Sequence, residues 1–308
     1  MRIGLTIPFR DVPLSELADL VRQAEVSGFD SVWSEESVNL DGVTPLAVAA
    51  ENSSRLRLAS GVLNVFTRGR ALLAQTAAAL DQLSGGRFVL GLGTSSNVIV
   101  ENWNRIAFER PLETMRETVG YLKRVLAGER GDGGFRLAQP PERPVPIVIA
   151  ALRPRMLKLA AELADGAFTN FLPLSSVATV VETFASPDKE LACRFFSVVG
   201  PIDEALVVAK RTLLAYATVP VYTEYFRWLG WGESLEPVVA AWQAGDRAAA
   251  FERAPEELVR EIFLLGSFEE QRARLRAFAD AGITTAVVTP IAPRADLSAA
   301  IDAFAAHA

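Results

Sequence analysis

The sequence predicts a single α/β domain built as a (β/α)8 TIM barrel, a closed ring of parallel strands surrounded by helices. Apolar runs of strand length alternate with helical stretches along the whole chain, and we identify about eight of them as strands. A chain of 308 residues has room for the roughly 250 residues of a typical barrel and two insertions. The alternative is an open dinucleotide-binding sheet. That fold requires Gly-x-Gly-x-x-Gly after the first strand, where this chain has Pro8-Phe9-Arg10. We therefore expect one barrel domain over residues 1–308.

The order of the predicted elements places the two insertions. A helix over residues 13–27 follows the first strand, and Thr44-Pro45 starts the next helix, because proline suits the first helical position. We expect one insertion after strand 4, in the Gly- and Pro-rich residues 128–144, and one between strands 7 and 8, in a long helical segment over 201–281. The third strand starts at Leu56, and the others are expected at residues 2–8, 31–33, 88–90, 146–150, 166–170, 194–199 and 285–289.

Polar loops follow the third and fourth predicted strands. The third strand ends in Gly61-Val62-Leu63-Asn64, and the fourth opens into Gly91-Leu92-Gly93-Thr94-Ser95-Ser96-Asn97. The helix between them stops at Ser84-Gly85-Gly86-Arg87, since glycine adopts the left-handed conformation of a helix C-terminus. A right-handed crossover brings the two loops side by side, and ligands of such folds bind at the carboxyl ends of the strands. We expect the functional site here, and a stabilising role for Ser84–Arg87 at the opposite face.

Composition limits the partners and the location. The net charge is −6 and basic residues do not cluster, which disfavours nucleic acid and anionic membrane surfaces as partners. The single cysteine, Cys193, cannot form an internal disulfide, and the N-terminus runs into a strand without a signal-peptide pattern. No apolar run has membrane-spanning length. These observations favour a cytoplasmic protein that acts on a small molecule.

Histidine usage excludes several kinds of catalysis. The only histidine is His307, next to the C-terminus. Zinc or iron sites with histidine ligands and Ser-His-Asp triads are therefore not expected, and we predict no metal. An enzyme with this composition takes its reactivity from an organic cofactor.

Two loops are candidates for anion binding. Gly91-x-Gly93 with the following Thr94 and Ser95 offers backbone amides and hydroxyls to a phosphate, although the same glycines could serve only a turn. Ala150-Ala151-Leu152-Arg153 leads into a helix whose free N-terminal amides favour an anion, and Arg153 or Arg155 adds positive charge. The alternative is that both arginines are solvated. We favour phosphate binding at the second loop.

Carboxylates and aromatic residues mark the candidate substrate side. Glu35 and Glu36 end the second strand, so one should face the barrel mouth and the other should turn away. A partly desolvated carboxylate at the mouth can act as acid or base. Trp33 is expected in the core. The aromatic-rich residues 222–242 could line an apolar substrate cavity, or could equally be a packed helical insertion or a subunit contact.

Six motifs carry a family resemblance. They are GFDSVWSEE (28–36), TPLAVAA (44–50), RLASGVLNVFTR (57–68), LDQLSGGRFVLGLGTSS (80–96), FERPLETMRET (108–118) and PIVIAALRPRMLKLAAELADGAFTN (146–170). In these motifs, which lie in order and at family spacing in the first half, the chain resembles the luciferase-like flavin and deazaflavin oxidoreductases. Within them it most resembles the coenzyme F420-dependent branch, which includes methylenetetrahydromethanopterin reductases.

The resemblance implies that the deazaflavin ring of F420 lies across the barrel mouth. A bulge with a non-proline cis peptide bond at Gly61–Val62 would support the ring, and the phosphate would lie at Ala150, Ala151 and Leu152. Together with the loop residues above, the candidate cofactor-binding set is Gly61, Val62, Asn64, Thr94, Ser95, Asn97, Ala150, Ala151, Leu152 and Arg153.

One motif departs from the branch. Its sugar-phosphate dehydrogenases carry Asp-His where this chain has Glu36-Ser37, so a histidine acid/base is absent and Glu36 is the predicted catalytic residue. The reaction implied is hydride transfer between the deazaflavin and a small organic substrate, at a CH-OH, CH-NH or C=C group. An FMN-dependent monooxygenase and a non-catalytic flavin-binding barrel are the alternatives. The family resemblance also implies a homodimer.

Overall fold

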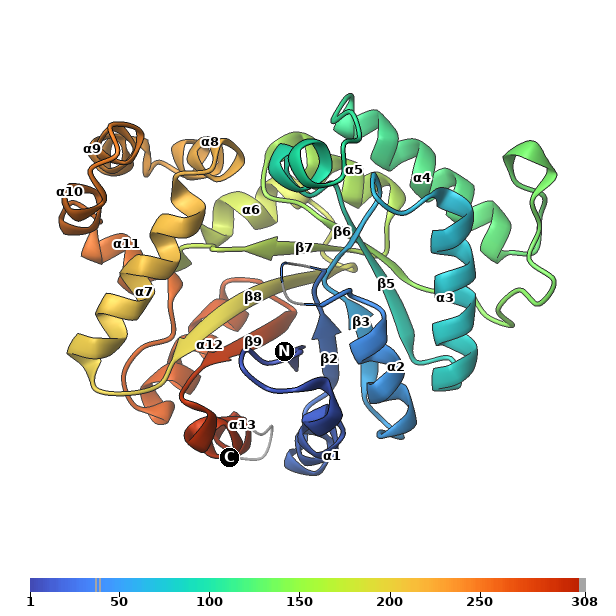
Figure 1. Ribbon diagram of the computed structural model, residues 1–308, viewed down its shortest axis with the longest axis horizontal. Coiled ribbons are helices and arrows are strands. Elements are labelled where there is room, and N and C mark those ends of the chain that lie inside the picture. Colours follow the sequence, from blue (N-terminus) through green and yellow to red (C-terminus); the bar gives the residue numbers. More distant parts are fainter. Residues whose placement is uncertain (37, 39, 305–308) are drawn as a thin grey trace.

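The structure is a closed parallel barrel with helices around it (Figure 1). The computed structural model describes residues 1–36, 38 and 40–304, so Ser37 and His307 lie outside the described residues. The strands follow one another in the order β3-β2-β1-β9-β8-β7-β6-β5-β4, and a pairing between β3 and β5 closes the ring. This confirms the predicted (β/α)8 fold.

Eight strand positions make up the barrel, and the third is divided into two short strands. The bounds are β1 Arg2–Ile7, β2 Ser31–Ser34, β3 Arg57–Ser60, β4 Leu63–Asn64, β5 Phe88–Gly93, β6 Ile147–Ala150, β7 Gly166–Asn170, β8 Glu190–Val198 and β9 Thr285–Ile291. The prediction for the seventh strand was wrong at its start, which lies at Glu190 and not at Arg194. Every residue from Leu191 to Val198 is buried, so the strand lacks the polar alternation that marks a half-exposed strand.

The helices cover the outside of the barrel. They are α1 Leu17–Ser27, α2 Thr44–Glu51, α3 Arg70–Ser84, α4 Pro111–Leu126, α5 Pro154–Leu163, α6 Val177–Phe184, α12 Phe268–Asp280 and α13 Leu297–Ala303. Leu73, Ala77 and Leu80 of α3 are buried against the strands, and the helix ends at Gly85, whose φ of 67° is left-handed as predicted. The part of the chain that the structure describes contains no helix with both the length and the hydropathy to span a bilayer.

Five further helices lie between β8 and β9, on one side of the barrel (Figure 1). They are α7 Ile202–Ala217, α8 Pro220–Trp228, α9 Gly232–Gln243, α10 Arg247–Glu252 and α11 Glu256–Ile262. The predicted single helical segment over 201–281 is in fact interrupted, because Gly230 and Gly245 take left-handed conformations and prolines begin new turns. We refer to α7–α11 as the helical insertion.

The buried apolar residues form three clusters. The largest fills the space between barrel and outer helices, and a second lies under the helical insertion and reaches Phe171 and Phe196 at the ends of β7 and β8. The third fills the barrel interior and consists of Trp33, Ala59, Val89, Val148, Phe168, Ala192 and Val287. Because side chains alternate along a strand, this interior cluster fixes which residues further along each strand face inward.

Arg87 ties together two loops at the face opposite the mouth. Its Nε donates to the Ser84 carbonyl at 2.7 Å, and its two Nη atoms donate to the carbonyls of Ala50, Ser53 and Leu56 at 2.7–3.3 Å. The guanidinium thus satisfies carbonyl groups at the end of α2 and before β3 that helix and sheet leave free. This contact network agrees with the stabilising role predicted for Ser84–Arg87.

Candidate active site

The inner face of the barrel, directly above the interior cluster, has two unlike halves. Residues two positions beyond each cluster member share its inward orientation. β1 contributes no member to the cluster, but its Gly4 lies beside Val287 and takes the corresponding position. On β3, β5 and β6 these positions hold small residues, and on β1, β2, β7, β8 and β9 they hold polar ones. The small half is Gly61, Gly91 and Ala150; the polar half is Thr6, Glu35, Asn170, Arg194 and Thr289.

The small half is shaped by a bulge of the chain between β3 and β4. The Gly61–Val62 peptide bond is cis, as the family resemblance implies. A Cβ atom on Gly61 would lie 3.2 Å from the Trp33 ring and 3.5 Å from the Phe168 ring. On Gly93 it would lie 2.4 Å from Cγ2 of Val62. The bulge therefore presents almost bare backbone to the mouth, a surface on which a flat ring can lie.

Asn64 supplies a polar group at the edge of this surface. Its Oδ1 accepts a hydrogen bond from the Phe66 amide at 2.9 Å, which fixes the side chain. Its Nδ2 is buried and has no partner among the residues that the structure describes. A buried N–H donor without an acceptor is costly, so an acceptor from a bound molecule would stabilise this site.

Glu36, the predicted catalytic residue, turns away from the inner face. Both of its carboxylate oxygens accept hydrogen bonds from Arg68, with Nη2 to Oε1 at 2.5 Å and Nε to Oε2 at 3.1 Å. Oε2 also accepts from the Asn64 amide at 3.3 Å. The hydrogen bonds to Glu36 raise the pKa of Arg68. Through its contact with the Asn64 amide, Glu36 fixes the backbone at Asn64. Its predicted role in proton transfer stays a prediction.

Glu35 takes the inward position, two residues beyond Trp33. Its Oε2 accepts hydrogen bonds from both Nη atoms of Arg194, at 2.5 and 2.7 Å. Arg194 lies two residues beyond the inward Ala192 on β8, and its side chain is only 8% exposed. The ion pair joins β2 to β8 across the mouth, over the intervening β1 and β9.

Sequence reasoning missed Arg194 because the strand was predicted to begin there. A signal was present, since it is the only charged residue in the apolar run Leu191–Val198. Such a charge is retained only with a partner. The cation also lies 4.9 Å from the centre of the Phe196 ring.

Tyrosines of the helical insertion complete the polar half. Tyr222 of α8 accepts a hydrogen bond from Asn170 Nδ2 at 3.3 Å, and its ring packs edge-on against that of Tyr216 at 5.2 Å. Burial raises the pKa of Tyr222 far above its ordinary value, so the phenol is neutral. The aromatic segment predicted at 222–242 is therefore a packed insertion that also reaches the mouth.

The residues predicted along the cofactor tail follow β5, and those predicted at the phosphate lie at the end of β6. Thr94 is half-buried, while Ser95 and Asn97 are exposed in the loop after Gly93. The Ala151 amide donates to the Phe168 carbonyl at 2.9 Å and so belongs to the sheet.

Leu152 and Arg153 follow directly and precede α5. No side chain caps this helix, and Arg153 is exposed without a carboxylate partner among the described residues. The amides at the start of α5 remain suited to an anion.

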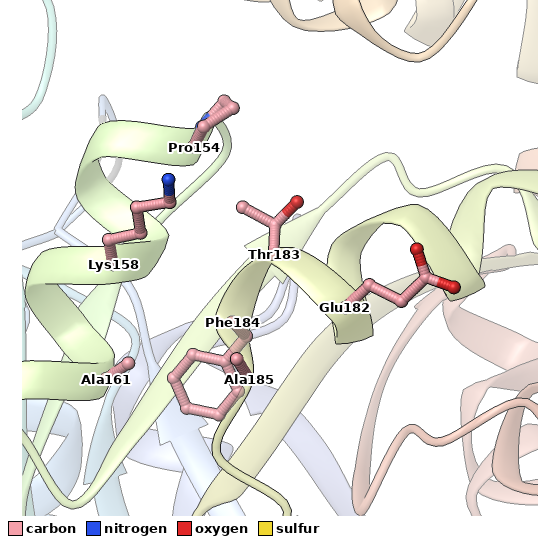
Figure 2. A pocket seen from close by; sticks show the side chains of 7 residues that line it. All are labelled: Pro154, Lys158, Ala161, Glu182, Thr183, Phe184 and Ala185. Carbon is pink, nitrogen blue, oxygen red and sulfur yellow. The ribbon is translucent and has the colours of Figure 1, made fainter.

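An open surface cavity of about 590 Å³ lies outside the barrel, between α5 and α6. Figure 2 shows Pro154, Lys158 and Ala161 on one side and Glu182, Thr183 and Phe184 on the other. None of the inward-facing residues described above lines it. The cavity is thus separate from the mouth. Within the described residues there is no cluster of His, Cys, Asp and Glu side chains that could hold a metal ion.

Comparison with known proteins identifies the family. A family model described as luciferase-like monooxygenase matches residues 1–285. The chain belongs to the luciferase-like monooxygenase family. This luciferase-like chain is 29% identical to a protein of Mycobacterium tuberculosis described as a coenzyme F420-dependent oxidoreductase, over 94% of this chain and 95% of the relative.

Two further proteins are similar to this luciferase-like chain. It is 36% identical to 5,10-methylenetetrahydromethanopterin reductase of Methanolobus tindarius, over 51% of each chain. Among solved structures, the F420-dependent tetrahydromethanopterin reductase of Methanopyrus kandleri superposes with a TM-score of 0.75 at 21% identity, covering 99% of this chain and 97% of that one. At this identity the superposition supports the barrel fold alone.

Proposed function

We propose that this protein is a coenzyme F420-dependent oxidoreductase that acts on a small organic substrate. The observation that carries the proposal is the 29% identity to an F420-dependent oxidoreductase along nearly the whole of both chains. The geometry of the mouth supports it, since the bare backbone at Gly61 and the unpartnered Nδ2 of Asn64 suit a flat ring with acceptor atoms at its edge.

Residues of the small half and of the loops next to it each have a role in binding the cofactor. Gly61 and Val62 support the ring from one face, and Asn64 donates to its edge. Thr94, Ser95 and Asn97 lie along the tail. Ala150 and Ala151 lie beside the phosphate, which the amides of Leu152 and Arg153 bind together with the Arg153 guanidinium. When bound, the deazaflavin accepts or donates a hydride at C5. The protein orients the reactants and excludes water from the mouth.

The proposal is tested by titrating the purified protein with F420 and with FMN, read by cofactor fluorescence and thermal shift. We expect F420 to bind at least about tenfold more tightly than FMN, a difference of about 1.4 kcal/mol. Asn64→Asp keeps the acceptor for the Phe66 amide but removes the donor to the ring, so it should weaken F420 binding about tenfold.

Other outcomes favour the two alternatives. Tight FMN binding with negligible F420 binding would favour an FMN-dependent monooxygenase, in line with the name of the family model. Cofactor binding without turnover of any alcohol, amine or enone in a broad panel would favour a non-catalytic flavin-binding barrel.

A cytoplasmic homodimer is part of the same proposal. Leu72 and Leu83 of α3 are 49% and 43% exposed, and such side chains on an outer helix suit a contact with a second copy. Sedimentation of the protein at micromolar concentration should give twice the mass of one 33.3 kDa chain. A single species of monomer mass would contradict this expectation.

A further inference from the structure

Glu35 has one carboxylate oxygen bound and one free. Both Nη atoms of Arg194 donate to Oε2, which holds the carboxylate in one orientation. Oε1 has no hydrogen-bond partner among the residues of 1–36, 38 and 40–304. The Glu35 side chain is 28% exposed, so a bound molecule can reach it.

The charges around Glu35 disfavour an anionic ligand. Glu35 and Arg194 together carry no net charge, and the two Nη atoms of Arg194 already serve the carboxylate. Nε of Arg194 has no hydrogen-bond partner among the described residues, but it is buried. An anion entering the mouth therefore meets the free oxygen of Glu35, with no exposed Nε–H of Arg194 to bind it. Tyr216 and Tyr222 also face Arg194, and the buried Tyr222 phenol is neutral.

The same geometry favours a hydrogen-bond donor. An ionised carboxylate accepts strong hydrogen bonds from O–H groups, and this one is pre-oriented by an ion pair in a largely buried setting. The small half, where the ring would lie, begins beside Glu35, because Gly61 follows β3 and β3 pairs directly with β2. A substrate between the two would place its reacting carbon toward the ring and its hydroxyl toward Glu35.

We propose that the substrate is a neutral molecule with a hydroxyl group on the reacting carbon, that Oε1 of Glu35 accepts this hydroxyl, and that Arg194 is the positioning residue. The inference rests on the proposed F420-dependent function and names the substrate class of that site. Glu35, and not Glu36, is then the catalytic carboxylate.

The proton and the electrons balance in the direction of oxidation. The substrate C–H bond breaks, and the hydrogen leaves with both electrons as a hydride to the cofactor. The O–H bond breaks, its proton moves to Oε1 of Glu35, and the electrons left on oxygen form the C=O bond. Glu35 then releases the proton to solvent. In the reverse direction Glu35 donates this proton to the carbonyl oxygen.

The test uses the F420-loaded protein and two probes of matched shape, cyclohexanol and cyclohexanecarboxylate, with binding measured by saturation-transfer NMR. We expect wild type to bind the alcohol at least tenfold more tightly than the carboxylate. Glu35→Gln should reverse this preference, because it removes the carboxylate and frees the Arg194 guanidinium, while F420 affinity stays within about twofold.

Three variants make the result specific. Arg194→Lys should keep the preference for the alcohol, since it keeps a cation beside Glu35. Arg194→Met should bind the alcohol more weakly, because the Glu35 carboxylate is no longer held in one orientation, but it should not favour the carboxylate, because the charge of Glu35 is then unbalanced. Glu51→Gln, an exposed carboxylate at the end of α2, should behave as wild type. Thermal unfolding in the presence of F420 shows whether each variant is folded. If a variant does not fold, the preference of the wild-type protein for the alcohol still tests the inference.

Several results would overturn the inference. They are a wild-type preference for the carboxylate, no alcohol binding at all, or an unchanged preference in Glu35→Gln. Loss of alcohol binding in Glu36→Gln but not in Glu35→Gln would give the role to Glu36. Failure of wild type to bind F420 would instead refute the proposed function, and the two failures are thus distinguishable.

Discussion

Replacing Gly91 by alanine is expected to prevent the barrel from folding stably. A Cβ atom at this position would lie 1.8 Å from the carbonyl oxygen of Ser60 and 2.9 Å from its carbonyl carbon. Both are backbone atoms of the bulge, so no side chain can rotate to relieve the clash. The Ser60 hydroxyl also exchanges hydrogen bonds of 2.8 Å with the amide and the carbonyl of Gly91. We expect a loss of more than about 4 kcal/mol in the free energy of unfolding.

Urea denaturation followed by circular dichroism measures this loss. Gly120→Ala is the matched control, because this glycine lies within α4 and a Cβ there would have nothing within 4 Å. Alanine favours a helix interior by about 0.5–1 kcal/mol, so the control should be slightly more stable than wild type. If Gly91→Ala were as stable as wild type, the close approach of the bulge to β5 would be wrong.

Replacing Glu190 by glutamine is expected to cost about 3 kcal/mol at pH 7. Glu190 lies at the start of β8, at the face opposite the mouth, with its side chain 8% exposed. It binds both Nη atoms of Arg57 at 3.1–3.2 Å, Arg2 at 2.9 Å and the Thr285 hydroxyl at 2.6 Å. Glutamine would leave both guanidinium groups without a counter-charge.

The pH dependence of this effect has a definite sign. Burial raises the pKa of Glu190, but the contacts with Arg57, Thr285 and Arg2 outweigh burial and hold the pKa below the ordinary 4.5. A carboxylate with a lowered pKa in the folded state stabilises the protein above about pH 4.5, and this stabilisation is lost as the pH falls through the folded-state value. The stability difference between wild type and Glu190→Gln should therefore shrink below pH 4.5.

Unfolding free energies at pH 7, 5 and 3.5 check this prediction. Glu162→Gln is the control, because its ion pair with Arg116 is exposed on the surface and should contribute little at any pH. Parallel curves for wild type and Glu190→Gln across this pH range would contradict the assignment.

The barrel was predictable because its signals are local. The glycines of β5 and the helix stop at Ser84–Arg87 act within a few residues, so the residue pattern alone located them. The cis bond at Gly61–Val62 was expected from the family resemblance. The start of β8 was not predictable in the same way, because polar and apolar residues do not alternate along a strand that is buried on both faces. For the same reason, Arg194 was not recognised as a residue inside the strand.

The orientation of Glu35 and Glu36 needed one further step. Trp33 was expected in the core, and its inward position already fixes Glu35 as inward and Glu36 as outward. The partners of the two carboxylates were beyond sequence reasoning. Arg194 is 159 positions from Glu35, and the two meet only because the sheet curves into a barrel. Arg68 is 32 positions from Glu36, and the pairing of β2 with β3 brings them together.

The two halves of the mouth come from different stretches of the polypeptide. The seat for the ring is encoded within residues 57–153, whereas most of the opposite wall, including the tyrosines of the helical insertion, is encoded after residue 166. Under the proposed function, mutations in the later stretch are expected to change the substrate without disturbing the residues proposed to hold the cofactor. Such a separation would allow substrate specificity to evolve through substitutions after residue 166. The same residues are the ones to vary in a mutant library designed to change the substrate.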